Sequence, residues 1–362
     1  RFHRRICNSL TVKLIFFTVT VDDMEINDMS NFNNGDTPFE SRIKVQELNH
    51  VAFRIRNEIS KVIVGQERVL DLILTALLAN GHVLIEGVPG VAKTLIAKLL
   101  ARSIDTGYSR IQFTPDLMPA DILGSEVLET GADGRRDFRF IEGPVFCQLL
   151  MADEINRASP RTQSALLQAM QEREVTIAGQ HRPLGAPFHV LATQNPIEQE
   201  GTYPLPEAQL DRFLMQIDVP YPSREAERAI LIATTGTSED SAVPVLDTGE
   251  LMNLQTLVRA MPVGEETLNA ILDLVARARP ENASDADVRE GVAWGPGPRA
   301  GQALMLAVRA RALLQGRLAP STEDVAALAG PVLKHRMALT FAARADGLSI
   351  DRLIARLASE AA

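Results

Sequence analysis

The segment His82-Val-Leu-Ile-Glu-Gly-Val-Pro-Gly-Val-Ala-Lys-Thr94 decides the fold of this chain. It begins with apolar residues that suit a buried strand, continues as a turn rich in glycine, and precedes leucines and isoleucines at helical spacing from Leu95 to Leu100. This order is typical of a phosphate-binding loop, because the backbone N–H groups of such a turn converge at the positive end of the helix. The segment therefore predicts a nucleotide site on a parallel α/β sheet.

Two residues of this loop predict specific contacts with the nucleotide. Lys93 would reach the β- and γ-phosphates, and the Thr94 hydroxyl would bind Mg²⁺. Ala92 departs from the usual glycine before the lysine, and its methyl group is tolerated only if the local backbone keeps φ negative. Taken alone, the segment could also be an ordinary glycine-rich turn. We expect ATP to be bound by nine consecutive residues, Gly87, Val88, Pro89, Gly90, Val91, Ala92, Lys93, Thr94 and Leu95.

Two carboxylates follow a second apolar strand. Residues 145–152 are mostly apolar and lead directly into Asp153 and Glu154. Both carboxylates are thereby expected at the carboxyl edge of the sheet, where ligands bind in open α/β folds. Asp153 would hold Mg²⁺, and Glu154 would orient and polarise the attacking water. Acidic residues also favour helix starts after strands, but the phosphate-binding loop upstream favours the catalytic interpretation.

One amide and two arginines complete the candidate site. Asn195 ends the apolar segment 188–194 and could hydrogen-bond the attacking water or the γ-phosphate. Arg212 and Arg299 could supply positive charge to the γ-phosphate, an effect of about 10³ to 10⁵ in rate in other phosphoryl-transfer systems. The alternatives are an ordinary turn at Asn195 and surface ion pairs for the two arginines.

The spacing of apolar segments predicts a chain in two parts. Five short apolar segments separated by helical stretches or loops predict a parallel sheet with helical crossovers; they are residues 82–85, 111–113, 145–151, 188–192 and 215–219. After Pro220-Tyr221-Pro222 no further strand is expected, because the Ala- and Leu-rich remainder has helical periodicity. We therefore predict a nucleotide-binding α/β domain at 46–222 and an all-helical domain at 223–362.

Residues 1–45 differ in character from the rest of the chain. Residues 1–20 contain no acidic side chain, and residues 21–40 contain no basic one. We interpret residues 1–45 as a disordered extension or as an over-extended reading frame whose true start is Met24 or Met29. A signal peptide is disfavoured, because Lys13 interrupts its apolar stretch and no small-residue cleavage site follows.

Composition narrows the functional classes. The 362 residues are 46% hydrophobic and 23% charged, as in ordinary globular proteins. A net charge of −9 argues against a protein that grips nucleic acid along its whole surface. No uninterrupted apolar run reaches the length of a membrane span. Cys7 and Cys147 lie far apart, so no disulfide framework is expected and a reducing cytoplasm fits. The six histidines lack metal-ligand spacing, so no zinc site is expected.

Taken together, these motifs resemble those of the MoxR family of AAA+ ATPases. The resemblance runs in family order from about residue 47 to His335 and includes the phosphate-binding loop, where family members also have alanine before the lysine. The other matching strings are Val64-Gly-Gln-Glu67, Gln112-Phe-Thr-Pro-Asp-Leu117, Pro119-Ala-Asp-Ile-Leu-Gly124, Ala152-Asp-Glu-Ile-Asn-Arg157, Ala192-Thr-Gln-Asn-Pro196, Glu207-Ala-Gln-Leu-Asp-Arg-Phe213 and the segment around Arg299.

The resemblance implies a fold, an assembly and residue roles. It implies a P-loop AAA+ αβα core with a parallel sheet, followed by a helical lid, in a homo-oligomeric ring, a hexamer, with ATP and Mg²⁺ between subunits. Val64 and Gly65 would line the adenine pocket, and Asn195 would be the first sensor. Arg212 would be the finger donated in trans to a neighbour's ATP, and Arg299 the lid sensor in cis.

The resemblance also implies a function. Segments 126–140 and 174–187 are similar to two hairpin insertions of the family, which could face the working surface of the ring or be solvated hairpins without a partner. We expect a chaperone that hydrolyses ATP to remodel or activate protein complexes, often with partners that have von Willebrand factor A domains, and that in some cases assists metal-centre maturation. The alternatives are a magnesium-chelatase-type motor subunit and a nucleic-acid-dependent, helicase-like motor, which the overall acidity disfavours.

Overall fold

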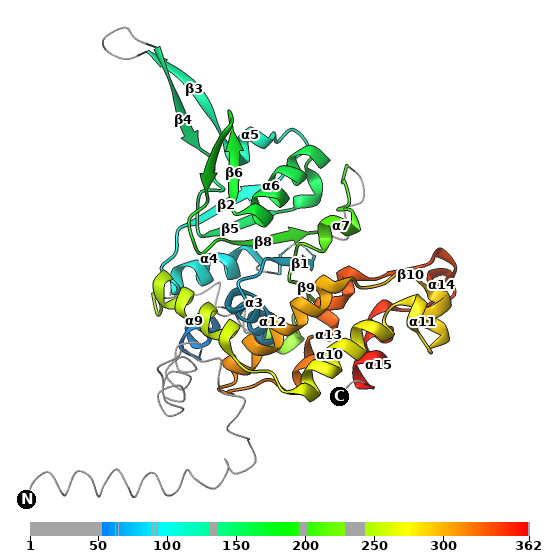
Figure 1. Ribbon diagram of the computed structural model, residues 1–362. Coiled ribbons are helices and arrows are strands. Elements are labelled where there is room, and N and C mark those ends of the chain that lie inside the picture. Colours follow the sequence, from blue (N-terminus) through cyan, green and yellow to red (C-terminus); the bar gives the residue numbers. More distant parts are fainter. Residues whose placement is uncertain are drawn as a thin grey trace, which may run out of the picture.

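The computed structural model of the chain is shown in Figure 1, and it describes residues 53–61, 63, 65–88, 90–91, 93–130, 136–195, 201–228 and 243–360. The extension expected at residues 1–45 lies outside the described residues. So do Val64, Pro89 and Ala92, so the expectations for these three residues remain predictions.

A five-stranded parallel sheet lies at the centre of the molecule, as predicted. The strands follow the order β2-β5-β8-β1-β9, so consecutive strands are joined by crossovers. Their bounds are β1 Val83–Gly87, β2 Tyr108–Gln112, β5 Leu149–Asp153, β8 His189–Gln194 and β9 Met215–Val219. Each strand overlaps one of the five predicted segments.

Helices cover both faces of the sheet. Along β1, Leu84 belongs to one cluster of buried side chains and Val83 and Ile85 to another, because successive side chains of a strand point to opposite faces. One face is covered by α5 (Pro119–Leu123) and α6 (Pro160–Glu172). The other is covered by α3 (Glu67–Leu78), α4 (Lys93–Ser103) and α9 (Thr248–Ala260). This burial on both faces explains why the strands read as continuous apolar runs.

Both predicted hairpins are present. Strands β3 (Gly124–Thr130) and β4 (Arg136–Glu142) pair antiparallel, and this hairpin projects from the body of the molecule (Figure 1). Strands β6 (Glu174–Ile177) and β7 (Gln180–Pro183) form the second hairpin, directly after α6.

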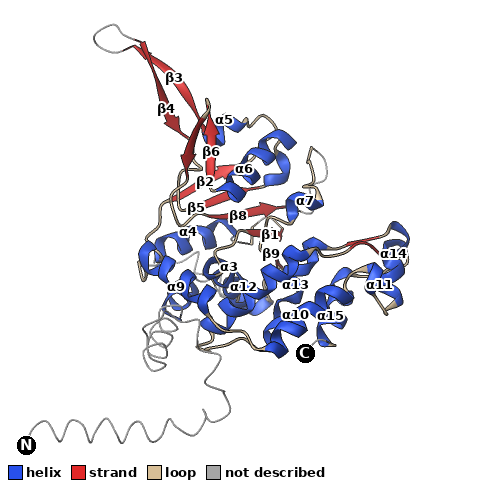
Figure 2. Cartoon of the chain, in the orientation of Figure 1, coloured by secondary structure: helices blue, strands red, loops and turns tan. Residues whose placement is uncertain are grey.

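The carboxyl-terminal part is helical, as predicted, and packs into the same apolar cluster as α3 and α4. Its helices are α10 Glu265–Arg277, α11 Ala286–Gly291, α12 Pro298–Leu314, α13 Thr322–Leu333, α14 Phe341–Ala345 and α15 Ile350–Ser359. The expectation that no strand follows Pro222 is wrong in one place, because β10 (Val292–Trp294) and β11 (Ala338–Leu339) form a short antiparallel ribbon (Figure 2). Among the described residues, no helix is long and apolar enough to cross a bilayer.

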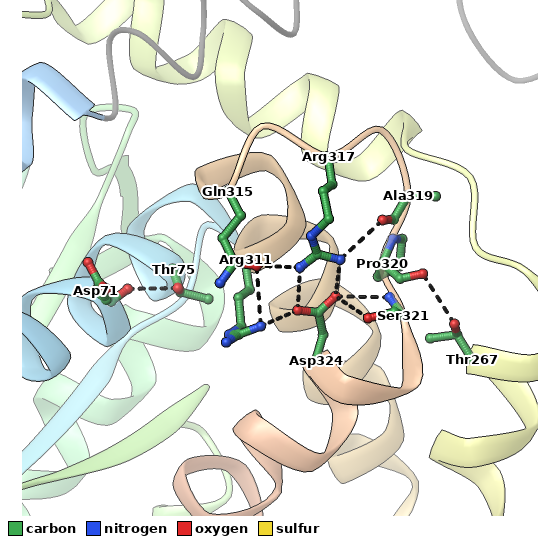
Figure 3. A network of polar contacts seen from close by, with 10 residues as sticks. All are labelled: Asp71, Thr75, Thr267, Arg311, Gln315, Arg317, Ala319, Pro320, Ser321 and Asp324. Atoms are coloured by element: carbon green, nitrogen blue, oxygen red, sulfur yellow. Dashed lines mark hydrogen bonds and ion pairs between the residues drawn. The ribbon is translucent and has the colours of Figure 1, made fainter. Parts of the chain in front are cut away.

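A buried ion-pair network ties α12 to α13 (Figure 3). Asp324, in the first turn of α13, has no exposed side-chain surface. Arg317 donates to its two oxygens at 2.7 and 2.6 Å, and Arg311 donates from α12. The Ser321 backbone N–H donates to the same carboxylate at 2.9 Å, which completes a capping box at the start of the helix. The network thereby fixes the angle between α12 and α13.

Candidate nucleotide-binding site

Three neighbouring strands bring the candidate residues to one edge of the sheet. Strand β8 lies between β5 and β1, and all three run parallel. Their carboxyl ends therefore lie side by side, with Asp153 at the end of β5, Asn195 directly after β8 and the phosphate-binding loop after β1. The order of the strands, rather than proximity in sequence, assembles this site.

The loop leads directly into α4, whose first residue is Lys93. Gly90 has a φ of +84°, a backbone conformation that favours glycine at this turn. The Lys93 ammonium donates to the carbonyl oxygens of Gly87 and, at 3.1 Å, of Val88. Burial holds the pKa of Lys93 below its usual value, although the negative charges of Asp153 and Glu154 oppose this effect. A half-buried cation at a helix amino end is the arrangement that a phosphate group requires.

Asp153 is the most heavily hydrogen-bonded group of the site. Its side chain is 11% exposed. One oxygen accepts from the Thr193 hydroxyl at 2.6 Å, and the other accepts from Arg110 at 2.7 Å and from the Thr94 hydroxyl at 3.2 Å. Burial alone would raise the pKa of Asp153, but the hydrogen bonds from Thr193 and Arg110 outweigh it and hold the pKa below its usual value. The carboxylate is therefore ionised at neutral pH.

The donor set at this edge fits Mg²⁺. Oxygen ligands from Asp153 and Thr94 lie together, and Mg²⁺ prefers oxygen and is commonly held by one or two carboxylates plus substrate phosphates. In the described parts of the chain, no group of three or more His, Cys, Asp or Glu could hold a metal ion by itself. Asp153 and Thr94 would thus hold Mg²⁺ together with a bound nucleotide.

Glu154 has a backbone conformation that is uncommon for a residue with a side chain. Its φ and ψ are 57° and 49°, in the left-handed region, and such residues often mark functional sites. Its backbone N–H donates to the Thr193 hydroxyl at 2.8 Å. Its carboxylate accepts from Gln112 at 2.8 Å and from Arg157 at 3.1 Å. The side chain of Glu154 is thereby held at the end of β2.

Two adjoining cavities continue from the loop. A cavity of about 340 Å³ is lined by Gly87 and Val88, and a larger one of about 530 Å³ includes Gly65. Gly65 has a φ of +76° and lies against Ala226, so a side chain at this position would collide. Four residues line both cavities, Asp218, Pro220, Tyr221 and Lys334. Gly65, which is expected to line the adenine pocket, lies in the lining of the larger cavity.

Arg212 and Arg299 lie elsewhere. Both line a cavity of about 290 Å³ with Gly81 and His82, at the amino end of β1. The phosphate-binding loop follows the carboxyl end of this strand, five residues away, or about 16 Å at the usual rise per residue. The structure therefore brings the two arginines together but does not bring Arg299 to the loop of its own chain. This placement argues against the cis role expected for Arg299.

The sequence did not single out three residues that contribute to the site. Arg110 and Thr193 contact Asp153 from β2 and β8, and this contact depends on the strand order, which the sequence does not reveal. Thr193 is a polar residue directly after the apolar residues Val190, Leu191 and Ala192 of β8, and that signal could have identified it. Lys334 lies after α13 and contacts Asp218 at 2.5 Å and Asp351 at 3.2 Å; no local pattern marks it.

Comparisons with known proteins agree with this geometry. Residues 82–215 match the ATPase family associated with various cellular activities (AAA), and residues 284–357 match the AAA lid domain. The chain is 45% identical to the chaperone MoxR1 of Mycobacterium tuberculosis over 309 residues, which cover 85% of this chain and 81% of that protein. It is 33% identical to the protein MoxR of Methylorubrum extorquens over 311 residues, 80% of this chain and 88% of that one.

A solved structure has the same fold. The crystal structure of a protein described provisionally as an ATPase, from Cytophaga hutchinsonii, superimposes with a TM-score of 0.81 and is 35% identical. The match covers 88% of this chain and 96% of that one. Core and lid therefore occur together in a relative, in the same relative arrangement.

Proposed function

Because the chain belongs to the MoxR family of AAA+ ATPases, we propose that it hydrolyses ATP with Mg²⁺ and uses the cycle to remodel or activate partner proteins. The observation that carries this proposal is the meeting of Thr94 and Asp153, 3.2 Å apart, beside the ammonium of Lys93 and the carboxylate of Glu154. A loop that only binds nucleotide would not need Glu154.

Each residue has a separate part in the proposed reaction. The loop N–H groups and Lys93 bind the β- and γ-phosphates. Thr94 and Asp153 hold Mg²⁺, which neutralises charge on the phosphates when bound. Glu154 positions a water in line with the γ-phosphate and accepts its proton. Asn195, 4% exposed at the end of β8, hydrogen-bonds the water or the γ-phosphate.

The two arginines act on a neighbouring subunit. Arg212 donates to the Leu167 carbonyl at 2.7 Å, and Arg299 lies 3.7 Å from Asp211. Their distance from their own loop supports a site in which one subunit supplies the loop and the next supplies the arginines, as in a ring. We extend the trans role from Arg212 to Arg299 on this ground. The number of subunits in that ring is proposed, from the family, to be six.

The partners and the compartment are also proposed. The projecting β3–β4 hairpin carries Leu128 and Phe138, which are 50% and 73% exposed and lie opposite each other in register. Exposed apolar pairs suit protein contacts better than phosphate backbones, which supports a protein client, including one with a von Willebrand factor A domain or an immature metal centre. We place the chain in the cytoplasm because the wide spacing of its two cysteines in the sequence predicts no disulfide framework.

The test uses two defective variants. Glu154→Gln should bind ATP normally and lose turnover by at least about 10²-fold, because the water loses its base. Arg212→Ala should lose turnover to a similar or greater degree. In mixtures, activity should exceed the sum of the two, since Arg212→Ala subunits have an intact loop and Glu154→Gln subunits an intact arginine. Steady-state ATPase at several mixing ratios measures this.

A matched control excludes a gain of ATPase activity that comes from mixing alone. Lys93→Ala and Glu154→Gln both disable the loop half of the site, so their mixtures should stay inactive at every ratio. Absence of recovery with Arg212→Ala would refute the trans arrangement, and equal loss of ATP binding and turnover in Glu154→Gln would refute the role of Glu154. If DNA or RNA stimulated turnover many-fold in a salt-dependent manner, the helicase-like alternative would replace the protein client.

A further inference from the structure

The cavity at the amino end of β1 contains more positive charge than the two arginines already discussed. Arg173 and Arg336 line it together with Arg212 and Arg299. Among its lining residues, the only carboxylate is that of Asp211. Four guanidinium groups thus share one carboxylate. A concave site with such an excess of positive charge attracts an anion.

Asp211 is already engaged by two of these arginines. Arg336 is 2% exposed and donates to the Asp211 carboxylate at 2.8 Å. It also donates to backbone carbonyls, including that of Leu214 at 3.0 Å, so its guanidinium is fixed. Arg299 adds a longer ion pair of 3.7 Å to the same acid. Little of the charge of Asp211 remains for the rest of the cavity.

Arg173 and Arg212 have carbonyl partners instead. Arg173 donates to the Asn80 carbonyl at 3.4 Å, and Arg212 to the Leu167 carbonyl at 2.7 Å. Within the described residues, neither has a carboxylate within ion-pair distance. A 3.4 Å contact is long for a hydrogen bond, so Arg173 gives up only a weak hydrogen bond when it turns toward an anion. Its side chain is exposed at the mouth of the cavity.

The backbone holds Arg173 at this position. It ends α6 in the left-handed conformation, with φ 56° and ψ 24°, where glycine or asparagine is usual. Its N–H donates to the Ala169 carbonyl, and its carbonyl accepts from Leu184, the residue after β7, both at 2.9 Å. Arg173 is therefore anchored to α6 and to the base of the β6–β7 hairpin.

We propose that Arg173 is a third trans arginine, which contacts the terminal phosphates of the nucleoside triphosphate bound by a neighbouring copy of the chain. This inference rests on the proposed ATPase function and on Arg212 acting in trans. The three guanidinium groups of Arg173, Arg212 and Arg299 form one anion-binding surface, with Arg336 and Asp211 as its fixed base. Because Arg173 also begins the β6–β7 hairpin, it links the neighbour's phosphates to that hairpin.

The test measures complementation rather than activity alone. Arg173→Gln removes the charge but keeps a donor for the Asn80 carbonyl. Turnover should fall by about tenfold or more, the loss of one charge-assisted hydrogen bond, with ATP binding by its own loop unchanged. In mixtures with Glu154→Gln, activity should exceed the sum of the two. Arg173→Lys should retain more activity than Arg173→Gln. Arg289→Gln, at a surface ion pair with Glu290 on α11, is the control and should behave as the unaltered chain.

The outcomes separate the two proposals. If mixing with Glu154→Gln restores turnover for both Arg212→Ala and Arg173→Gln, the role of Arg173 as a third trans arginine is supported. Recovery with Arg212→Ala alone overturns the role of Arg173 and leaves the proposed function intact. Recovery with neither overturns the trans arrangement altogether. Full activity of Arg173→Gln also overturns the inference, whereas a melting temperature far below that of Arg173→Lys would show a folding role and overturn it in the same way.

Discussion

Asp153 shows how single side chains prepare the site for a cation. Its carboxylate accepts from Thr193, Arg110 and Thr94, and these donors keep its pKa below the usual value despite its burial. The Thr193 hydroxyl has two functions, because it donates to Asp153 and accepts from the Glu154 backbone N–H at 2.8 Å. One hydroxyl thereby contacts both the carboxylate of Asp153 and the backbone of Glu154.

Replacing Thr193 with valine tests these contacts. Valine has nearly the same shape, so the fold should persist, but the Asp153 carboxylate would lose its shortest hydrogen bond. We expect the Mg²⁺ concentration at half-maximal ATPase activity to rise by about 10- to 100-fold, as for other residues that orient metal ligands. Thr193→Ser should stay close to the unaltered chain. An unchanged Mg²⁺ dependence in Thr193→Val would contradict the assignment.

At this scale the sequence predicts local patterns well and contacts between strands poorly. Lys93 and Thr94 follow from one continuous loop, and Asp153 follows from one strand end. Arg110 and Thr193 reach Asp153 only because β2 and β8 flank β5, and strand order is decided by packing over the whole sheet. For the same reason the sequence could not show that Arg299 lies beside Arg212.

At the scale of elements, α13 depends on a single buried acid. Asp324 is fully buried and joins Arg317, Arg311 and Ser321 (Figure 3). Burial would raise its pKa, but these donors keep the pKa below the usual value. Ser321 is the N-cap residue of this helix. The sequence did not single out the acid three residues later, because the burial of a charged side chain cannot be read from its residue type.

Asp324→Asn should destabilise the chain by about 3 kcal/mol, because it leaves two arginines without their buried counter-charge. The midpoint of urea unfolding at pH 7 measures this, and Glu323→Gln, exposed on the same helix, is the control. The contribution of Asp324 is complete above the ordinary pKa of about 3.9. It is lost as the pH falls below that value through the lower folded-state pKa. The two chains should therefore converge in stability in strong acid, and a constant difference there would contradict the assignment.

The β10–β11 ribbon is the element that the sequence did not predict. It contains three residues on one strand and two on the other, which is too short for an alternating pattern to appear. The longer elements were predicted because each carries enough apolar residues to define a period.

At the scale of the whole molecule, Lys334 connects lid and core beside the nucleotide cavities. It binds Asp218 on β9 and Asp351 on α15, and the nearby Glu86 carboxylate accepts from Gln216 at 2.5 Å. Burial would lower the pKa of Lys334, but the hydrogen bond and charge of Asp218 raise it overall. Lys334 therefore lies among three carboxylates where a nucleotide is expected to bind.

Two substitutions here should change ATP affinity in opposite directions. Lys334→Gln leaves the carboxylates unbalanced and should weaken binding by about tenfold, which corresponds to roughly 1.4 kcal/mol. Asp351→Asn removes one negative charge and should strengthen binding. Titration with a fluorescent ATP analogue measures both, with Lys61→Gln, at an exposed ion pair with Glu58, as control. If the two substitutions changed the ATP affinity in the same direction, this electrostatic role would be ruled out.

The two ends of β1 have a kinetic consequence. The phosphate-binding loop follows one end and the arginine cavity surrounds the other. In the proposed trans arrangement, an isolated copy would therefore hold two halves that belong to different sites. Turnover by dilute protein would then rise more steeply than in proportion to its concentration, because each working site needs an encounter between copies. The concentration of the chain in a cell would then control its ATPase activity, so that a modest change in expression produces a larger change in ATP consumption.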